Sequence, residues 1–339
     1  FDLSDVLFIT TANTLDTVPR PLLDRMEVIE LGSYTDEEKL MIAKNHLIPK
    51  QLQKHGLKKT QLKITDDAVR EAIDGWTRES GVRNLERAIA KMCRKASLQL
   101  VEDEELKKVP VPNRNISQFL GTRVFSEEFK YAADQVGIVT GLAWTSVGGT
   151  ILEMEVNTFK GKGDNELSGN LGKVMQESAT AALSYIRSHC NELGIAEDFF
   201  YTTDIHVHFP EGAVPKDGPS AGIAMCTAIV SALTGRTVKR TVAMTGEISI
   251  RGRVMPIGGL KEKTMAALRN GVTTVIIPKE NEKDLEEIDQ TVRRALKFVP
   301  VETVDAVFAT AFAKETAAAV EHMTALSAES SSNTATLRF

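Results

Sequence analysis

The segment from Ser220 to Thr234 limits the possible folds more than any other part of the sequence. It is nearly all apolar, so a helix formed here has no polar face to turn towards water. Such a helix must be covered on every side, which requires further layers of structure around it. Stretches typical of strands alternate with helical patterns on both sides of it, and we therefore expect an α/β or α+β domain.

The expected elements of this domain begin near residue 130, where the composition becomes rich in Gly, Val, Ile and Thr. Apolar runs predict four single strands and one pair of strands: 136–140, 151–156, 203–209, 273–278, and a pair within 242–254. Helical spacing predicts three helices: 171–193, 220–234 and 260–270.

The glycine-rich stretch 161–173 invites comparison with a phosphate-binding loop. Such a loop needs a glycine at its start and Ser or Thr directly after its lysine. Here Leu167 stands in the place of the first glycine, and Val174 stands where a hydroxyl would meet magnesium. We therefore expect 161–173 to be a surface loop.

The first third of the chain has a different pattern. Val6–Thr11 and Val28–Leu31 are short apolar runs typical of buried strands. Two strands alone cannot bury both faces of a sheet, so the rest of that domain is expected to lie outside this chain. Residues 35–105 are predicted to form a small helical bundle, with helix starts at Thr35 and Thr65.

Charge and composition exclude several classes of protein. With 41 basic and 46 acidic residues the net charge is −5, which excludes a generally basic nucleic-acid binder but not a local basic patch. No apolar run of about 18 residues and no signal-peptide pattern occurs, so no membrane association is expected. Cys93, Cys190 and Cys226 match neither a disulfide framework nor a zinc site, and a cytoplasmic location is expected.

The most informative stretch for chemistry is 210–222. Its glycines and prolines force a tight turn, after which Ser220 begins the apolar helix. Free N–H groups and the positive end of the helix dipole at this point are suited to stabilise an oxyanion. From the spacing alone an N-cap is the favoured interpretation of Ser220, because a serine before an apolar helix is usually one. A nucleophilic serine also needs a base.

Histidines and lysines are the candidate bases. His206 and His208 face the same side of one strand, but nothing completes a His–Asp arrangement, and such a pair is weak evidence for a metal. Lys261 and Lys263 lie at the start of the helix 260–270 among apolar residues, where burial lowers the pKa of a lysine and makes it a usable base. The spacing does not decide between the two lysines.

Two motifs resemble those of a known family. Pro215-Lys-Asp-Gly-Pro-Ser-Ala-Gly222 closely resembles the nucleophile motif of the Lon proteases, which are ATP-dependent serine peptidases with a Ser–Lys dyad. Gly258-Gly-Leu-Lys-Glu-Lys263 resembles the segment that carries their catalytic lysine, and Lys263 stands 43 residues after Ser220. The resemblance implies that Ser220 is the nucleophile and selects Lys263 as the base.

The resemblance also implies supporting residues. Ala243-Met-Thr-Gly-Glu247 is similar to the strand whose threonine orients the lysine, which assigns that role to Thr245. Asp217 stands three residues before the serine, where the family has an aspartate that influences activity. His206-Val-His208 matches a family segment with a supportive role.

The upstream part resembles the end of the family's AAA+ ATPase module. Asn13 falls at the sensor-1 position, Arg25 at the arginine finger and Arg83 at sensor 2. An amide can position the attacking water, and an arginine can stabilise phosphoryl charge. The phosphate-binding loop and the metal-binding aspartate of that module are absent from this sequence, so this chain alone is not expected to hydrolyse ATP. The resemblance implies ATP and Mg as cofactors of the full-length protein. No cofactor is expected for this chain alone.

The implied organisation has four parts. They are a remnant of the AAA+ α/β subdomain at 1–32, a helical AAA+ subdomain at 33–122, an α+β Ser–Lys protease domain at 123–317, and a disordered or non-native tail at 318–339. The implied function is ATP-dependent endopeptidase cleavage of unfolded polypeptides by a cytoplasmic homohexameric ring of the soluble bacterial type.

Two other functions remain open at this point. One is a binding module that scaffolds a ring or binds nucleic acid, with a dyad that is never assembled. The acidic composition counts against nucleic acid. The other is a degenerate ATPase regulator, which depends only on Asn13, Arg25 and Arg83.

Overall fold

The computed structural model describes residues 2–12, 15, 18–29, 32–125, 133–145 and 148–313. The chain divides into two compact units, one up to Ser33 and one from Tyr34 onwards. The tail predicted at 318–339 lies outside the described residues.

The first unit contains one short helix, α1 (Arg20–Leu23), in its described part. The strand predicted at Val6–Thr11 is wrong, since these residues form no strand and Leu7 is 85% exposed. A strand needs a hydrogen-bonding partner, and no described residue supplies one. In the run Val28–Leu31 the first two residues are not in a strand and the last two lie outside the described ranges.

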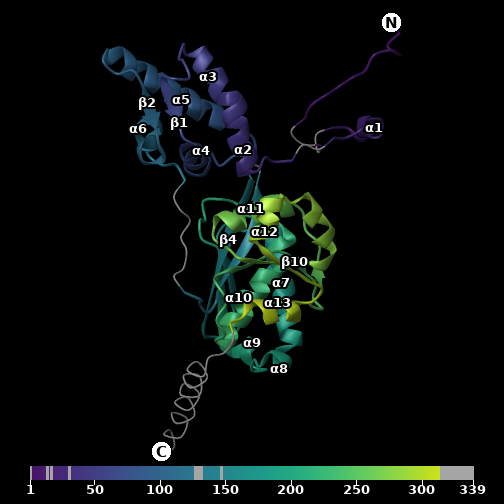
Figure 1. The fold of residues 1–339 in the computed structure, drawn as a ribbon. Coiled ribbons are helices and arrows are strands. Elements are labelled where there is room, and N and C mark those ends of the chain that lie inside the picture. The colour runs from purple at the N-terminus through teal and green to yellow at the C-terminus, as the bar shows by residue number, and fades with distance from the viewer. Residues whose placement is uncertain are drawn as a thin grey trace, which may run out of the picture. The chain divides into compact units, whose positions relative to one another are not determined.

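Residues from Tyr34 to about 125 form a helical bundle with a small parallel sheet, drawn in blue in Figure 1. The helices are α2 (Asp36–Ile42), η1 (Ala43–Leu47), α3 (Ile48–Lys54), α4 (Asp66–Ala72), η2 (Ile73–Thr77), α5 (Arg83–Glu102), η3 (Asn113–Asn115) and α6 (Ile116–Leu120). The strands are β1 (Leu62–Ile64) and β2 (Val109–Val111).

The sequence signals for this bundle are confirmed. Thr35 forms a capping box with Glu38 at the start of α2, and Thr65 caps α4. Helix α5 buries one side in the core through residues at helical spacing: Leu85, Ile89, Met92, Cys93 and Ala96. The bundle therefore has its own hydrophobic core.

A seven-stranded sheet organises the rest of the chain (Figure 1). Its strands, in spatial order, are β11 (Lys297–Val301), β10 (Thr274–Pro278), β7 (Val242–Met244), β3 (Ile138–Thr145), β4 (Gly148–Lys160), β6 (Thr203–His208) and β5 (Asn165–Ser168). The first four are parallel to one another, β4 is antiparallel to both of its neighbours, and β5 is parallel to β6. A separate hairpin joins β8 (Glu247–Ile248) and β9 (Val254–Met255).

Helices cover both faces of this sheet. They are α7 (Lys173–Ser188), α8 (Cys190–Leu193), α9 (Phe199–Thr202), η4 (Pro219–Ala221), α10 (Gly222–Thr234), α11 (Leu260–Arg269), η5 (Lys279–Glu287), α12 (Gln290–Ala295) and α13 (Val304–Ala311). One hydrophobic cluster joins α7, α10 and α13 to the sheet, and another joins α11 and α12 to it. In β10 the side chain of Ile276 belongs to the first cluster, while Val275 and Ile277 belong to the second, as alternation along a strand requires.

Helix α10 belongs to the layer formed by α7, α10 and α13 on one face of the sheet. Every residue from Gly222 to Ser231 is buried, which confirms the prediction from its apolar sequence. Helix α11 covers the opposite face, and it approaches β4 so closely that a Cβ atom at Gly149 would lie 1.9 Å from the carbonyl oxygen of Glu262. Leu152 and Met154, on the other side of β4, belong to the cluster of α10. Helices α10 and α11 therefore sandwich the same strands.

Three predicted elements differ from the structure. The stretch 161–173, predicted to be a surface loop, contains the edge strand β5. This strand forms because it pairs with β6, and its polar sequence alone does not predict it. The helix predicted at 171–193 is broken at His189, whose φ of −124° interrupts α7 before α8. The region 242–254 holds three strands rather than two.

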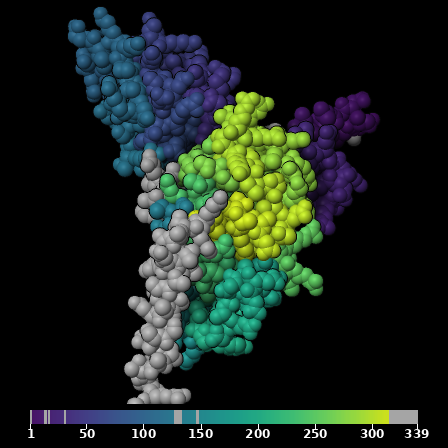
Figure 2. Space-filling view, turned by 60° about the horizontal axis from the view of Figure 1, so that its bottom comes forward, coloured from purple at the N-terminus to yellow at the C-terminus, as the bar shows by residue number. Residues whose placement is uncertain are grey.

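The C-terminal part of this domain forms a continuous surface in Figure 2, where the yellow atoms of the last described strand and helix pack against green atoms of the preceding segments. The parallel pairing of β11 with β10 explains this continuity. Within the ranges given above, no helix is long and apolar enough to cross a bilayer.

The close approach at Gly149 predicts that Gly149→Ala is destabilising. The added methyl group forces α11 away from β4, and overpacking of this kind costs about 1–3 kcal/mol. We expect the Tm, measured by differential scanning calorimetry, to fall by several degrees. Gly258→Ala is the matched control, since a Cβ there meets no atom within 4 Å. Equal Tm values for the two variants would contradict the packing described here.

Candidate active site

Lys263 lies in the first half of α11 with its side chain turned into the protein. The residue is 2% exposed, and its Nζ donates a hydrogen bond to the Oγ1 of Thr245 at 3.1 Å. Burial disfavours the charged form and lowers the pKa of Lys263 from 10.5 to about 8. Lys261, the other lysine in the motif, is only half-buried. The structure thus places Lys263, and not Lys261, in the environment that a basic lysine requires.

Thr245 connects this amine to the candidate nucleophile. It follows directly after β7, is fully buried, and its backbone N–H donates to the carbonyl of Ile276. Its hydroxyl accepts from Lys263 Nζ and donates to the backbone carbonyl of Ser220 at 3.4 Å. A hydroxyl has one proton to donate and lone pairs to accept with, so Thr245 can make both bonds at once.

Ser220 lies in the short 3₁₀ turn η4 and is half-buried. Its carbonyl also accepts from the N–H of Gly246 at 2.9 Å, and Ile223 donates back to the carbonyl of Gly246. The Ser220 hydroxyl makes no hydrogen bond to another described residue, and the N-cap of α10 is Ala221. The interpretation of Ser220 as an N-cap is therefore wrong, and the α-helix begins two residues later than predicted, at Gly222.

The side chains of Lys263 and Thr245 meet the backbone of Ser220 beyond the carboxyl end of β7. Ser220 comes from the segment that leads into α10, and Lys263 comes from α11 on the opposite face of the sheet. Helices from two faces can converge only past the end of a strand, and this is also where open α/β sheets place ligands. The arrangement puts a poorly solvated amine one hydroxyl group away from the serine backbone.

Asp217 holds the loop that carries Ser220. Its Oδ1 accepts hydrogen bonds from the N–H of Met175 at 3.0 Å and of Gly218 at 2.9 Å. Met175 is the third residue of α7, so the carboxylate caps that helix from another part of the chain. Gly172 makes room for it, because a Cβ there would lie 2.3 Å from the Asp217 Cγ.

The two histidines occupy a different place. The Ser168 hydroxyl lies 2.7 Å from His206 Nε2 and 2.7 Å from His208 Nδ1, so it joins the edge strand β5 to β6. The Glu166 carboxylate lies 3.8 Å from His206 Nδ1. Neither imidazole is hydrogen-bonded to Ser220. Among the described residues, no group of three or more His, Cys, Asp or Glu side chains is arranged to hold a metal ion.

Comparison with known proteins decides the family. The Lon protease (S16) C-terminal proteolytic domain matches residues 110–314, and the Lon protease AAA+ ATPase lid domain matches residues 53–109. The chain belongs to the Lon protease family. Its mixed α/β fold, with a helical lid preceding a sheet-based protease domain, is the one expected for that family.

Bacterial relatives agree with this assignment. The chain is 57% identical over 307 residues to Lon protease 1 of Bacillus subtilis (strain 168), and 56% identical over 307 residues to the Lon protease of Heliobacterium modesticaldum. It is 53% identical over 314 residues to the Lon protease of Clostridioides difficile (strain 630). These matches cover 91–93% of the chain but only 38–40% of the relatives.

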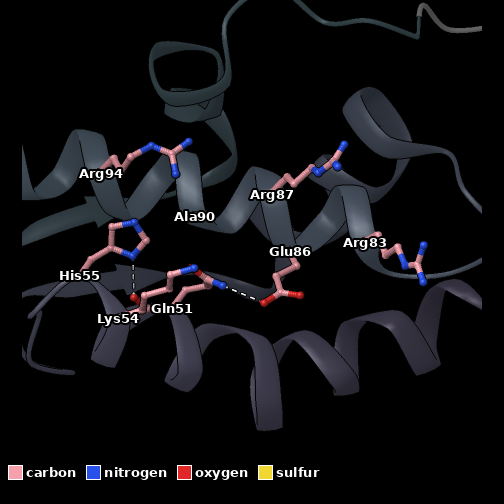
Figure 3. A pocket seen from close by; sticks show the side chains of 8 residues that line it. All are labelled: Gln51, Lys54, His55, Arg83, Glu86, Arg87, Ala90 and Arg94. Carbon is pink, nitrogen blue, oxygen red and sulfur yellow. Dashed lines mark hydrogen bonds between the residues drawn. The ribbon is translucent and has the colours of Figure 1, made fainter.

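In the Lon lid, Arg83 is the first residue of α5 and lines a pocket of about 380 Å³ between α3 and α5. Figure 3 shows the eight residues that line it: Gln51, Lys54, His55, Arg83, Glu86, Arg87, Ala90 and Arg94. Its one carboxylate is occupied, since Glu86 accepts from Gln51 at 2.8 Å and pairs with Lys50 at 2.8 Å. The pocket is therefore basic.

Arg87 and Arg94 were missed by sequence reasoning. They stand four and eleven residues after Arg83, a spacing that puts all three on one side of a helix and could have revealed them. Arg25 is exposed in the first unit, just after α1, and Asn13 lies outside the described residues. The ATPase roles of these residues stay predictions.

We expect Asp217→Ala to loosen the loop before Ser220. The N–H groups of Met175 and Gly218 lose their acceptor, and removal of a helix cap costs about 0.5–2 kcal/mol. Chemical denaturation should show this loss. Asp217→Asn keeps an acceptor oxygen and should lose less. An Asp217→Ala protein as stable as the unsubstituted chain would show that the capping contact does not form.

Proposed function

We propose that this chain carries the peptidase part of an ATP-dependent serine endopeptidase, with Ser220 as nucleophile and Lys263 as general base. The observation that supports this most strongly is the buried Lys263 amine, with its pKa lowered to about 8 and its hydrogen bond to the threonine that also holds Ser220. Thr245 orients the amine, and Asp217 positions the loop.

The proposed reaction proceeds through an acyl-enzyme. The uncharged Lys263 amine removes the proton from the Ser220 hydroxyl as the oxygen attacks the peptide carbonyl. The resulting ammonium then gives this proton to the leaving amine when the C–N bond breaks. Water, deprotonated by the same amine, releases the acyl group and regenerates the serine. Backbone N–H groups near Ser220 would stabilise the oxyanion.

The proposed substrates are unfolded polypeptides, and the proposed assembly is a cytoplasmic homohexameric ring. The family assignment supports both the polypeptide substrate and an oligomeric state. The cytoplasmic location is supported by the free thiols of Cys93, Cys190 and Cys226, which suit a reducing environment.

The lid is proposed to sense nucleotide in the complete ATPase. The basic pocket that contains Arg83 suits the phosphate groups of ATP, because guanidinium groups bind phosphate oxygens in a bidentate manner. Bound ATP with Mg would supply the energy for unfolding substrates. Asn13 would position the attacking water as sensor 1, and Arg25 would stabilise phosphoryl charge as the arginine finger.

The alternative of a binding module with an unassembled dyad is less well supported. It requires the lysine and the serine to be separated, whereas Lys263 lies one hydroxyl group from the Ser220 backbone. A nucleic-acid partner draws support only from the basic pocket of the lid. We therefore place the peptidase function first.

The lowered pKa of Lys263 predicts the pH dependence of the reaction. The base must be uncharged, and below a pKa of about 8 its uncharged fraction falls about tenfold per pH unit. We therefore expect the rate at which a fluorophosphonate labels Ser220 to rise from pH 6 to pH 8 and to become constant above about pH 9. Mass spectrometry of the labelled peptide measures it.

Two variants control this experiment. Ser220→Ala should not be labelled, and Lys263→Gln should be labelled about 10²–10⁴-fold more slowly, without the rise between pH 6 and pH 8. Labelling of the Ser220→Ala chain at another residue, or an unchanged rate in Lys263→Gln, would refute the proposed dyad.

The nucleotide proposal has its own test in a protein of the relatives' length. Arg83→Ala should reduce ATP hydrolysis at least tenfold because phosphoryl charge loses a stabilising cation. Arg114→Ala, in η3 and outside the lining of this pocket, is the matched control and should retain activity. Equal ATPase rates for the two variants would remove Arg83 from this role.

A further inference from the structure

Lys216 lies four residues before Ser220 in the sequence. Its ammonium group is hydrogen-bonded to backbone carbonyl groups rather than to carboxylates. Its Nζ donates to the carbonyl oxygens of Glu211 at 2.8 Å, Val214 at 3.2 Å and Gly169 at 3.4 Å. An ammonium group has three protons, so all three bonds can form together. Two of these carbonyls belong to the loop of Ser220 itself, and the third belongs to the segment after β5.

The loop before Ser220 needs these hydrogen bonds because part of its backbone adopts an unfavourable conformation. Glu211 has a φ of 62°, a left-handed value that is uncommon for a residue with a side chain. Its carbonyl accepts from the N–H of Val214 as well as from Lys216, so it is held at the centre of a turn. Without the ammonium group, this turn loses the charged donor that holds it closed.

The backbone of Lys216 joins the same two segments. Its N–H donates to the carbonyl of Asn170 at 3.0 Å, and its carbonyl accepts from the N–H of Gly172 at 2.8 Å. The next residue, Asp217, caps α7. Main chain and side chain at 216 therefore tie the loop of Ser220 to the connection between β5 and α7.

We propose that Lys216 is a positioning residue whose ammonium group gathers the three carbonyls and so holds the Ser220 loop in the conformation that presents the nucleophile. This inference rests on the proposed peptidase function, because it assigns a purpose to the loop geometry at that site. Lys216 is not a catalytic residue, since it acts through the backbone of residues 169, 211 and 214.

The proposal differs from a purely electrostatic role. A cation near the site would act by lowering the pKa of Lys263, so that its removal would shift the pH profile to higher pH. A positioning residue alters the geometry of the nucleophile and leaves that pKa unchanged. The pH profile therefore separates the two roles.

The test compares Lys216→Met with the unsubstituted full chain. Methionine keeps the aliphatic bulk and removes the donors, so the plateau rate of fluorophosphonate labelling at Ser220 should fall about 10–100-fold. The kcat for fluorescein-labelled casein should fall by a similar factor, the KM should change less than about threefold, and the pH midpoint should not move. Lys216→Arg, which keeps charged N–H donors, should recover part of the rate.

Lys239→Met is the matched control. Lys239 is half-buried in the same domain and donates to the carbonyl of Thr310 at 2.7 Å, so this variant also removes an ammonium–carbonyl bond, but one outside the Ser220 loop. It should retain the labelling rate. An equal fall in both variants would mean a general loss of stability and would overturn the proposal.

Hydrogen exchange provides a readout that does not depend on activity. In Lys216→Met, amides at 169–172 and 211–218 should exchange faster, while those in α10 should be unchanged. Unchanged exchange in the loop, an unchanged labelling rate, or a shifted pH midpoint would each overturn the positioning role. If Lys216→Met does not fold, Lys216→Gln is measured against the same criteria.

The outcomes also separate this inference from the proposed function. Failure of the unsubstituted chain to be labelled at Ser220 refutes the peptidase function, whatever the exchange of the loop. Normal labelling of the unsubstituted chain and of Lys216→Met alike leaves the peptidase function intact and refutes only the role of Lys216.

Discussion

The site depends on the burial of the Lys263 amine and on its hydrogen bond to Thr245. A lysine with little access to water is costly as an ammonium ion, and the hydrogen bond to Thr245 compensates only part of the lost hydration. Because its pKa is lowered in the folded state, the unfolded chain binds more protons between about pH 8 and pH 10.5, and the stability of the fold rises across this interval. At neutral pH the buried Lys263 therefore lowers the stability of the fold, a cost that is often found at functional sites.

Backbone hydrogen bonds in the surrounding fold hold Thr245 and Ser220 in place next to the Lys263 amine. Thr245 can hold Lys263 because β7 ends just before it, and the carbonyl of Ser220 is fixed by two donors from the same segment. The loop before Ser220 is in turn fixed by Asp217 at the start of α7. Most of these partners are N–H and C=O groups of the main chain, which any sequence supplies. Side-chain identity matters at few positions, and these are the positions that carry the family motifs.

The sequence was sufficient for the elements whose patterns are strong. The apolar run after Ser220, the cap at Thr35 and the helix of Lys263 were predicted correctly because local periodicity and capping chemistry determine them. The strand β5 was not predicted because it is stabilised by pairing with β6 and not by its own sequence. The break of the long helix at His189 was not predicted because no proline or glycine lies at that position. The two lysines of the motif could be separated only by the family resemblance or by their different burial in the structure. The three-carbonyl contact of Lys216 left no trace in the sequence, since its acceptors are main-chain atoms.

The placement of α10 and α11 on opposite faces of the sheet has a mechanical consequence. The proposed nucleophile is attached to one layer and the proposed base to the other, and Thr245, just after β7, is hydrogen-bonded to both segments. A small sliding of one layer against the other would move Ser220 away from Lys263 without unfolding either helix. Under the proposed peptidase function, shear between the two layers would stop cleavage from a distance while Ser220 and Lys263 are both still present.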